Sequence, residues 1–204
     1  MKGRFTAIYF AGMLVEILIR LPRERQRHQT PKTDRRVTRA EQSLLTGLSV
    51  GVVVLPAIYS LTSWLDVANY RWSSTTKARM GRIGTILLSA AIWLFWRAHR
   101  DLGNNWSPSL EIDAHQTLVT EGVYRAIRHP MYTSQLLWGI GQALLLPNWI
   151  AGSGGLLAFL ALYQVRVPHE ERLMLDHFGN AYREYMQHTG RVLPRLPRED
   201  VGAA

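Results

Sequence analysis

The sequence contains no cysteine. Disulfide bonds and zinc sites built on thiolates are therefore excluded. Glycine-rich dinucleotide and phosphate-binding motifs of soluble nucleotide folds are also missing, and the seven histidines do not have the His-Glu-x-x-His spacing of a metalloprotease. We therefore expect no bound metal ion and no soluble nucleotide-binding fold.

Charge is missing from a run of 33 residues, 131–163. Shorter apolar runs lie upstream, and the mean hydropathy of −0.07 hides them because arginine and lysine gather between the runs. A helix rises about 1.5 Å per residue and a bilayer core is about 30 Å thick, so runs of this size suit membrane helices. The sequence predicts an all-α membrane protein with five spans, at about residues 5–19, 43–65, 83–96, 131–146 and 149–165.

The last two predicted spans form a tight helical hairpin. Pro147 cannot continue a helical hydrogen-bond ladder and Asn148 tolerates turn conformations, so the long apolar run breaks there. Lipid provides no hydrophobic drive for helix association, so small residues are needed where helices approach closely. The hairpin has five of them: Gly139, Gly141, Gly152, Gly154 and Gly155.

Two features of the first two predicted spans are better explained by structure than by catalysis. Pro56 predicts a kink in the second span, where Ser43, Gly47 and Gly51 are spaced by four residues and predict a packing groove. Glu16 lies near the basic end of the first span, and we expect its carboxylate to reach toward the membrane interface.

The basic residues predict an orientation. Five spans place 18 of the 24 lysines and arginines on one side of the membrane, in segments 20–42, 97–130 and 166–204. Cytoplasmic loops carry the excess of basic residues, so the N-terminus is expected outside and the C-terminus inside. A net charge of +9 also suits nucleic-acid binding, but these residues flank apolar runs instead of forming one stripe, so no nucleic-acid partner is expected.

No linker or repeat divides the chain, so residues 1–204 are expected to form one membrane domain. Its C-terminal segment is predicted to be helical, because Phe178, Tyr182, Tyr185 and Met186 recur on one helix face, with a break at Gly179. This apolar face is expected to pack on the membrane interface or to cover the loop 100–130.

Two polar motifs flank the predicted hairpin. The first contains Gly122, Tyr124, Arg128, His129, Pro130 and Tyr132, and the second contains Arg166, Glu170, Glu171, Phe178, Gly179, Tyr182, Tyr185, Arg191 and Pro194. Together, over residues 97–195, they resemble the isoprenylcysteine carboxyl methyltransferase family. The segment Asp101-Leu-Gly-Asn-Asn-Trp-Ser107 and the five-span length resemble the short prokaryotic members.

The resemblance implies a methyltransferase that uses S-adenosylmethionine and a lipid-modified carboxylate as acceptor, in the cytoplasmic membrane of a prokaryote. It assigns substrate binding to Arg166 and cofactor contact to Glu170. The remaining cofactor residues it implies are Gln116, Leu118, Val119, Tyr124, His129, Pro130 and Tyr132. Gln116 departs from the family, which often has histidine there.

The proposed chemistry suits these residue types. A carboxylate is ionised at neutral pH, so its methylation needs alignment and control of charge more than a strong base. Arg166 can grip a carboxylate bidentately, and Glu170, one helical turn later, can contact the cofactor or orient Arg166. The alternative is that Arg166 and Glu170 form an interfacial ion pair of little energetic value.

Three other functions remain open from sequence. Phospholipid N-methyltransferases share the general plan, NADPH-dependent sterol reductases share an Arg-His-x-x-Tyr block, and a non-catalytic membrane protein needs only the apolar features. For a lipidated acceptor we expect lateral access from the bilayer, with the break at Pro147-Asn148 leaving a gap in the hairpin.

Overall fold

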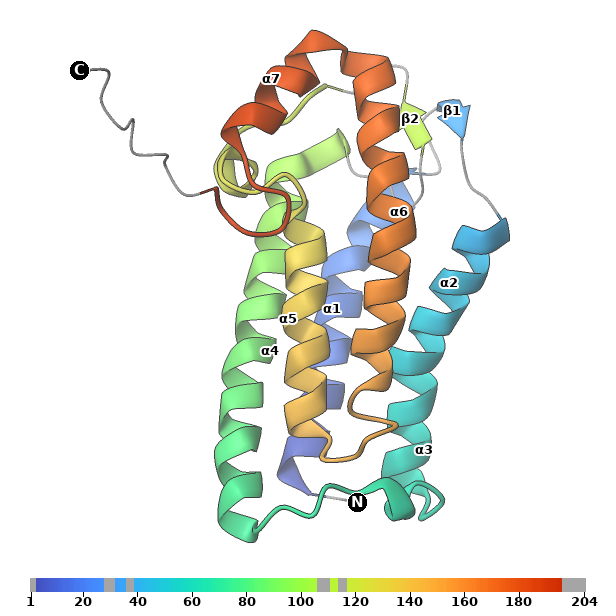
Figure 1. Cartoon of the computed structure of the whole chain (residues 1–204), viewed down its shortest axis with the longest axis vertical. Coiled ribbons are helices and arrows are strands. Elements are labelled where there is room, and N and C mark those ends of the chain that lie inside the picture. The colour runs from blue at the N-terminus through green and yellow to red at the C-terminus, as the bar shows by residue number, and fades with distance from the viewer. Residues whose placement is uncertain (1–2, 28–31, 36–38, 106–110, 114–116, 196–204) are drawn as a thin grey trace, which may run out of the picture.

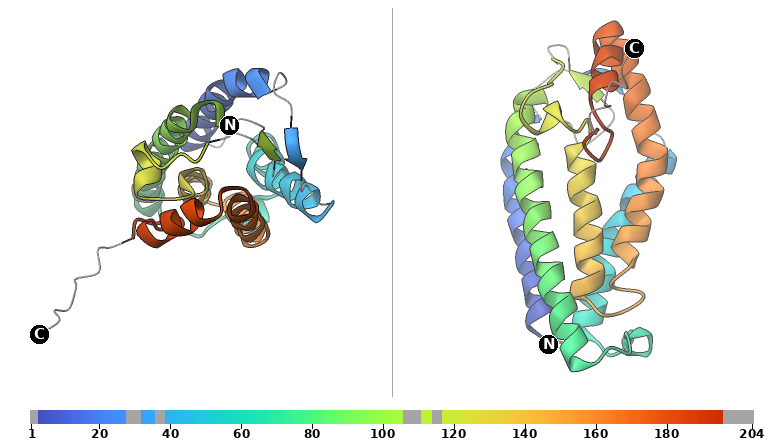
Figure 2. Two further views of the ribbon diagram at one scale, coloured as in Figure 1. Left: turned by 90° about the horizontal axis from the view of Figure 1, so that it is seen from above. Right: turned by 60° about the vertical axis from the view of Figure 1, so that its left-hand side comes forward.

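The computed structural model describes residues 3–27, 32–35, 39–105, 111–113 and 117–195. It is a bundle of long helices that run alternately in opposite directions (Figure 1). The helices are α1 (Arg4–Arg27), α2 (Arg39–Ser49), α3 (Leu55–Leu61), α4 (Ser74–Leu102), α5 (Pro130–Leu145), α6 (Gly154–Phe178) and α7 (Asn180–His188). The helix α5 lies near the middle of the bundle seen from above, and α7 lies across the end where α6 finishes (Figure 2).

Within the described residues, three stretches are long and apolar enough to cross a membrane: Arg4–Pro22, Glu41–Leu61 and Ser74–Leu102. The helix α5 has only 16 residues, and the second half of α6 is charged, so the count of five spans stays a prediction. The predicted all-α fold is confirmed, and the described residues add two short strands, β1 (Lys32–Arg35) and β2 (Glu111–Asp113), which pair antiparallel. In the chain β1 lies between α1 and α2, and β2 lies between α4 and α5; both strands lie at the end of the bundle that carries α7 (Figure 1).

The hairpin of α5 and α6 is wider at its turn than the sequence predicts. The carbonyl oxygen of the Asn148 side chain accepts hydrogen bonds from the backbone N–H groups of Ile150 and Ala151, at 3.0 and 2.9 Å. These bonds hold residues 149–152 as a turn, so α6 begins at Gly154 and not at the predicted residue 149. Along the helices the approach is close, because a Cβ atom added at Gly139 would lie 2.9 Å from Leu156 Cα.

The packing groove predicted for the second span is confirmed at Gly51 and not at Gly47. A Cβ atom at Gly51 would lie 2.7 Å from the carbonyl oxygen of Gly154, so α6 packs closely there. At Gly47 the same atom would meet nothing within 4 Å. The lower part of the groove therefore joins helices, and its upper part faces open space.

A π-helical turn, Val50–Val54, separates α2 from α3. Pro56 follows it and has no N–H to continue the ladder to the Gly51 carbonyl. The fully buried side-chain amide of Gln142 donates to that carbonyl instead, at 2.9 Å. The Tyr9 hydroxyl donates to the neighbouring Val52 carbonyl at 2.6 Å, so α1 and α5 both supply partners to the irregular turn.

Candidate active site

A cavity of about 460 Å³ lies inside the bundle near the α7 end. Eight of the nine site residues predicted from sequence line it: Leu118, Val119, Tyr124, His129, Pro130, Tyr132, Arg166 and Glu170. The ninth, Gln116, lies outside the described residues. The fold therefore brings together side chains from α5, α6 and the loop before α5.

The loop before α5 is anchored to the end of α4. The Asp101 carboxylate accepts a hydrogen bond from the Val123 N–H at 2.9 Å and pairs with Arg97 at 3.2 Å. Gly122 has φ of +61°, and any side chain there would collide with the Asp101 carboxylate. The glycine of the motif is thus required by backbone conformation and by space, and it places the buried Tyr124 ring against the cavity.

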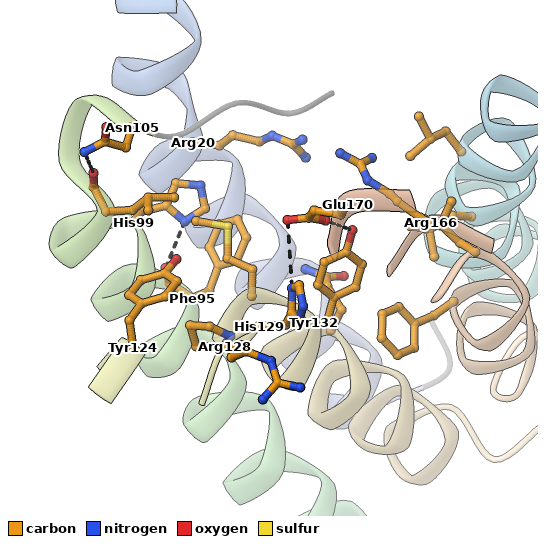
Figure 3. A pocket seen from close by; sticks show the side chains of 18 of the residues that line it. Arg20, Phe95, His99, Asn105, Tyr124, Arg128, His129, Tyr132, Arg166 and Glu170 are labelled. Carbon is orange, nitrogen blue, oxygen red and sulfur yellow. Dashed lines mark hydrogen bonds and ion pairs between the residues drawn. The ribbon is translucent and has the colours of Figure 1, made fainter. Parts of the chain in front are cut away.

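Tyr132 and Glu170 meet across the hairpin. The Tyr132 hydroxyl donates to Glu170 Oε2 at 2.7 Å, and His129 Nδ1 lies 3.9 Å from Glu170 Oε1 (Figure 3). Glu170 therefore presents a carboxylate inside the cavity with an aromatic hydroxyl and an imidazole beside it.

Arg166 is buried, with 9 % of its surface exposed, and points into the same cavity (Figure 3). Its Nη1 atom lies 3.3 Å from Oε1 of Glu41, which is 2 % exposed and belongs to the first turn of α2. Sequence reasoning offered Glu170 as a residue that orients Arg166 and did not identify Glu41. The partner was missed because α2 and α6 become neighbours only in the folded bundle.

Glu171 forms a buried charge cluster behind the cavity wall. Its Oε1 atom lies 3.3 Å from Arg128 Nε and 3.3 Å from His129 Nε2, and its Oε2 atom lies 2.5 Å from Arg191 Nη2. Burial favours a higher pKa for the Glu171 carboxyl, but hydrogen bonds from His129 and Arg191 outweigh it and lower the pKa to about 2. Glu171 thus joins both motifs, a role that sequence reasoning did not assign.

The segment after α7 closes over the same motif. The backbone N–H groups of Arg128 and His129 donate to the carbonyls of Gly190 and Arg191, at 2.8 and 3.0 Å. Tyr185 on α7 donates its hydroxyl to the Tyr124 carbonyl at 2.6 Å. The sequence predicts that the apolar face of the C-terminal helix packs on the membrane interface or covers the loop 100–130, and this contact at Tyr124 supports the second alternative. The predicted break at Gly179 is confirmed by the boundary between α6 and α7.

The first and fourth helices also contribute to the cavity, which the sequence did not reveal. Phe95 and His99 line it from α4, with ring centroids 4.1 Å apart. Glu16 lines it from α1 and accepts a hydrogen bond from the Gln135 amide at 2.7 Å. The expectation that Glu16 reaches toward the membrane interface is therefore wrong, because its carboxylate turns inward to α5.

Comparison with known proteins gives one family. The family model described as the isoprenylcysteine carboxyl methyltransferase family matches residues 83–176. Protein-S-isoprenylcysteine O-methyltransferase B of Arabidopsis thaliana is 29% identical over 147 residues, which are 72% of this chain and 72% of the relative. The Homo sapiens protein-S-isoprenylcysteine O-methyltransferase is 31% identical over 134 residues, or 64% of this chain and 44% of that protein.

A solved structure agrees in fold. The eukaryotic intramembrane Ras methyltransferase, an isoprenylcysteine carboxyl methyltransferase, superposes with a TM-score of 0.51 at 26% identity. The match covers 76% of this chain and 50% of that one. Both relatives and the solved structure are eukaryotic, so they do not support the resemblance to short prokaryotic members. In sequence and in fold, the chain is therefore similar to the isoprenylcysteine carboxyl methyltransferases.

Proposed function

We propose that this chain transfers a methyl group from S-adenosylmethionine to the carboxylate of a prenylated cysteine or a similarly lipidated acceptor. The observation that carries the proposal is the buried Arg166 in one cavity with the Tyr132–Glu170 pair. A guanidinium suits a carboxylate, and a carboxylate beside a hydroxyl and an imidazole suits the cationic and hydroxyl groups of the donor.

The residues present fit the donor. The cavity volume of about 460 Å³ falls within the range of about 300–1,000 Å³ that is usual for ligand sites. Apolar side chains and aromatic rings offer a surface for an adenine ring, and Glu170 offers a carboxylate that is partly accessible from the cavity. The residues that would hold the donor are Leu118, Val119, Tyr124, His129, Pro130, Tyr132 and Glu170.

The donor would supply a methyl group on a sulfonium, so transfer to the acceptor's carboxylate oxygen would form a C–O bond, break the S–CH₃ bond and leave the donor as a neutral thioether. Arg166 would hold and orient the acceptor carboxylate, which is already ionised and needs no base. The burial of Arg166 removes competing water, which strengthens the attraction between guanidinium and carboxylate. Tyr132 would keep Glu170 directed into the cavity through its hydrogen bond.

We place the lateral route for the lipid chain between α1 and α2. Met13 and Ile17 on α1 line one side of the cavity, and Leu45 and Leu48 on α2 line the other. The hairpin, where we expected the gap, is tightly packed at Gly139 and Leu156. A lipid chain gains about 0.8 kcal/mol for each methylene kept in an apolar environment, so the acceptor would remain in the bilayer and present its carboxylate to Arg166.

The orientation and compartment belong to the same proposal. The excess of basic residues at the α7 end supports a cytosolic site with the N-terminus outside. We also propose that the chain is a short prokaryotic form in a cytoplasmic membrane.

Radiolabelled methyl transfer tests the proposed function. The full chain in detergent should methylate N-acetyl-farnesylcysteine and should be much slower with the same compound without its prenyl chain. Equal rates on the two compounds, or transfer to phosphatidylethanolamine, would indicate a soluble-acceptor or phospholipid enzyme. Calorimetry that detected NADPH binding and no S-adenosylmethionine binding would indicate a reductase instead.

A further inference from the structure

Arg166 is paired before any acceptor arrives. Its Nη1 atom lies 3.3 Å from Glu41 Oε1, and both side chains are buried. The pair joins α6 to α2, which borders the lateral route into the cavity. The group that would bind the acceptor carboxylate is therefore neutralised by a carboxylate of the protein itself.

An acceptor carboxylate and Glu41 compete for one guanidinium. Arginine binds carboxylates best through two parallel hydrogen bonds from its planar fork. Two carboxylates on the same buried guanidinium share its single positive charge, so each is held more weakly than it would be alone. Binding of the acceptor must therefore weaken the Arg166–Glu41 pair.

Glu41 can tolerate a weaker ion pair with Arg166 better than most buried carboxylates could. It lies in the first turn of α2, where the unpaired N–H groups and the helix dipole stabilise negative charge. The pair is therefore suited to open and close while the helix remains folded.

Methylation reverses the competition. The product is a neutral ester, which has no charge with which to hold the guanidinium against Glu41. We propose that Glu41 is a specificity-determining residue that exchanges with the acceptor's carboxylate on Arg166 and takes the guanidinium back once the ester has formed. This inference rests on the proposed function. Glu41 then lowers the affinity for the acid and favours release of the ester.

The test is equilibrium binding of N-acetyl-farnesylcysteine and of its methyl ester to the full chain in detergent, with no methyl donor present. Glu41→Gln removes the competing charge and keeps the side-chain shape. It should bind the acid about tenfold more tightly, while its affinity for the ester should stay within about twofold of wild type. Glu41→Asp shortens the side chain by one methylene and should give a smaller gain in affinity for the acid. It replaces Glu41→Gln in the test if that variant does not fold.

Glu184→Gln is the control, because Glu184 is an exposed carboxylate on α7. Its ratio of acid to ester affinity should remain close to that of wild type. Unchanged or weaker acid binding in both Glu41 variants would overturn the inference, as would an equal gain in Glu184→Gln. If the wild type does not methylate N-acetyl-farnesylcysteine, the proposed function fails; if it does and the Glu41 variants gain nothing, only the exchange fails.

Discussion

Tyr132 on α5 donates its hydroxyl to Glu170 on α6 at 2.7 Å, although 38 positions separate them. The contact ties together the two motifs that flank the hairpin, because each motif contributes one of the partners. It also places Glu170 where a donor molecule in the cavity would meet it.

We expect Glu170→Ala to weaken S-adenosylmethionine binding by about 1–3 kcal/mol, because the donor would lose a hydrogen-bond partner in the cavity. Tyr132→Phe should have a smaller effect, since the carboxylate remains and loses only its orienting hydroxyl. Isothermal titration calorimetry in detergent measures both. His169→Ala is the control, because His169 precedes Glu170 on the same helix and is exposed. Unchanged affinity in Glu170→Ala would mean that the donor binds elsewhere.

Arg166→Lys should lower turnover by roughly ten- to a hundredfold, because it keeps the charge and loses the bidentate geometry. Arg166→Ala should lower it further, and both variants should keep nearly normal donor affinity. The control is Arg172→Lys on the exposed face of α6. Wild-type methyl transfer by a folded Arg166→Ala protein would contradict the proposed role of this residue.

We expect Glu171 to stabilise the folded protein at neutral pH and to lose this effect at acidic pH. Its pKa in the folded protein is about 2, below the ordinary value of 4.5, so its contribution is complete above pH 4.5 and disappears as the pH falls toward 2. Glu171→Gln should lower the melting temperature at pH 7, by a loss of about 1–3 kcal/mol, and the difference from wild type should shrink at pH 3. Glu184→Gln, on the exposed face of α7, should show neither effect. A difference that persists undiminished down to pH 2 would contradict this account.

The orientation can be tested by labelling single cysteines, since the chain has none of its own. Val67→Cys lies between α3 and α4 and is 93 % exposed, and Glu184→Cys lies on α7 at the other end of the bundle (Figure 1). A membrane-impermeant maleimide added to intact cells should label the first and not the second. The opposite pattern would place the cavity on the outer side of the membrane.

Gln142→Leu should destabilise the bundle by about 1–3 kcal/mol, because it leaves buried carbonyl groups of Gly51 and Ala151 without their donor. Thermal unfolding in detergent measures the loss. Leu144→Ala on the same helix tests whether any truncation there has this effect, and a smaller loss is expected since Leu144 is only partly buried.

The grouping of the predicted site residues in one cavity followed from the sequence, because an apolar hairpin must return the chain to the membrane face that it left. The sequence did not show which of Glu170 and Glu171 would face the cavity and which would pair with arginine. Successive residues of a helix point about 100° apart, so Glu170 faces the cavity and Glu171 faces Arg128 and Arg191. The sequence shows the two glutamates as neighbours but not the direction of either.

The partners of Arg166 and Glu16 were hidden for another reason. Glu41 and Gln135 lie on helices whose neighbours are fixed by the packing of the whole bundle, and no spacing in the sequence records that packing. Asn148 was assigned to the turn correctly, but its bonds to Ile150 and Ala151, which delay the start of α6, depend on side-chain geometry.

The turn before Pro56 constrains how the protein is assembled. During synthesis the segment from α2 to α3 is made after Tyr9 and well before Gln142, so the donor that Gly51 has in the folded bundle is not yet available when this segment is made. A carbonyl left unpaired in hydrocarbon would cost several kcal/mol. We therefore expect the turn to take its final form only when α5 arrives.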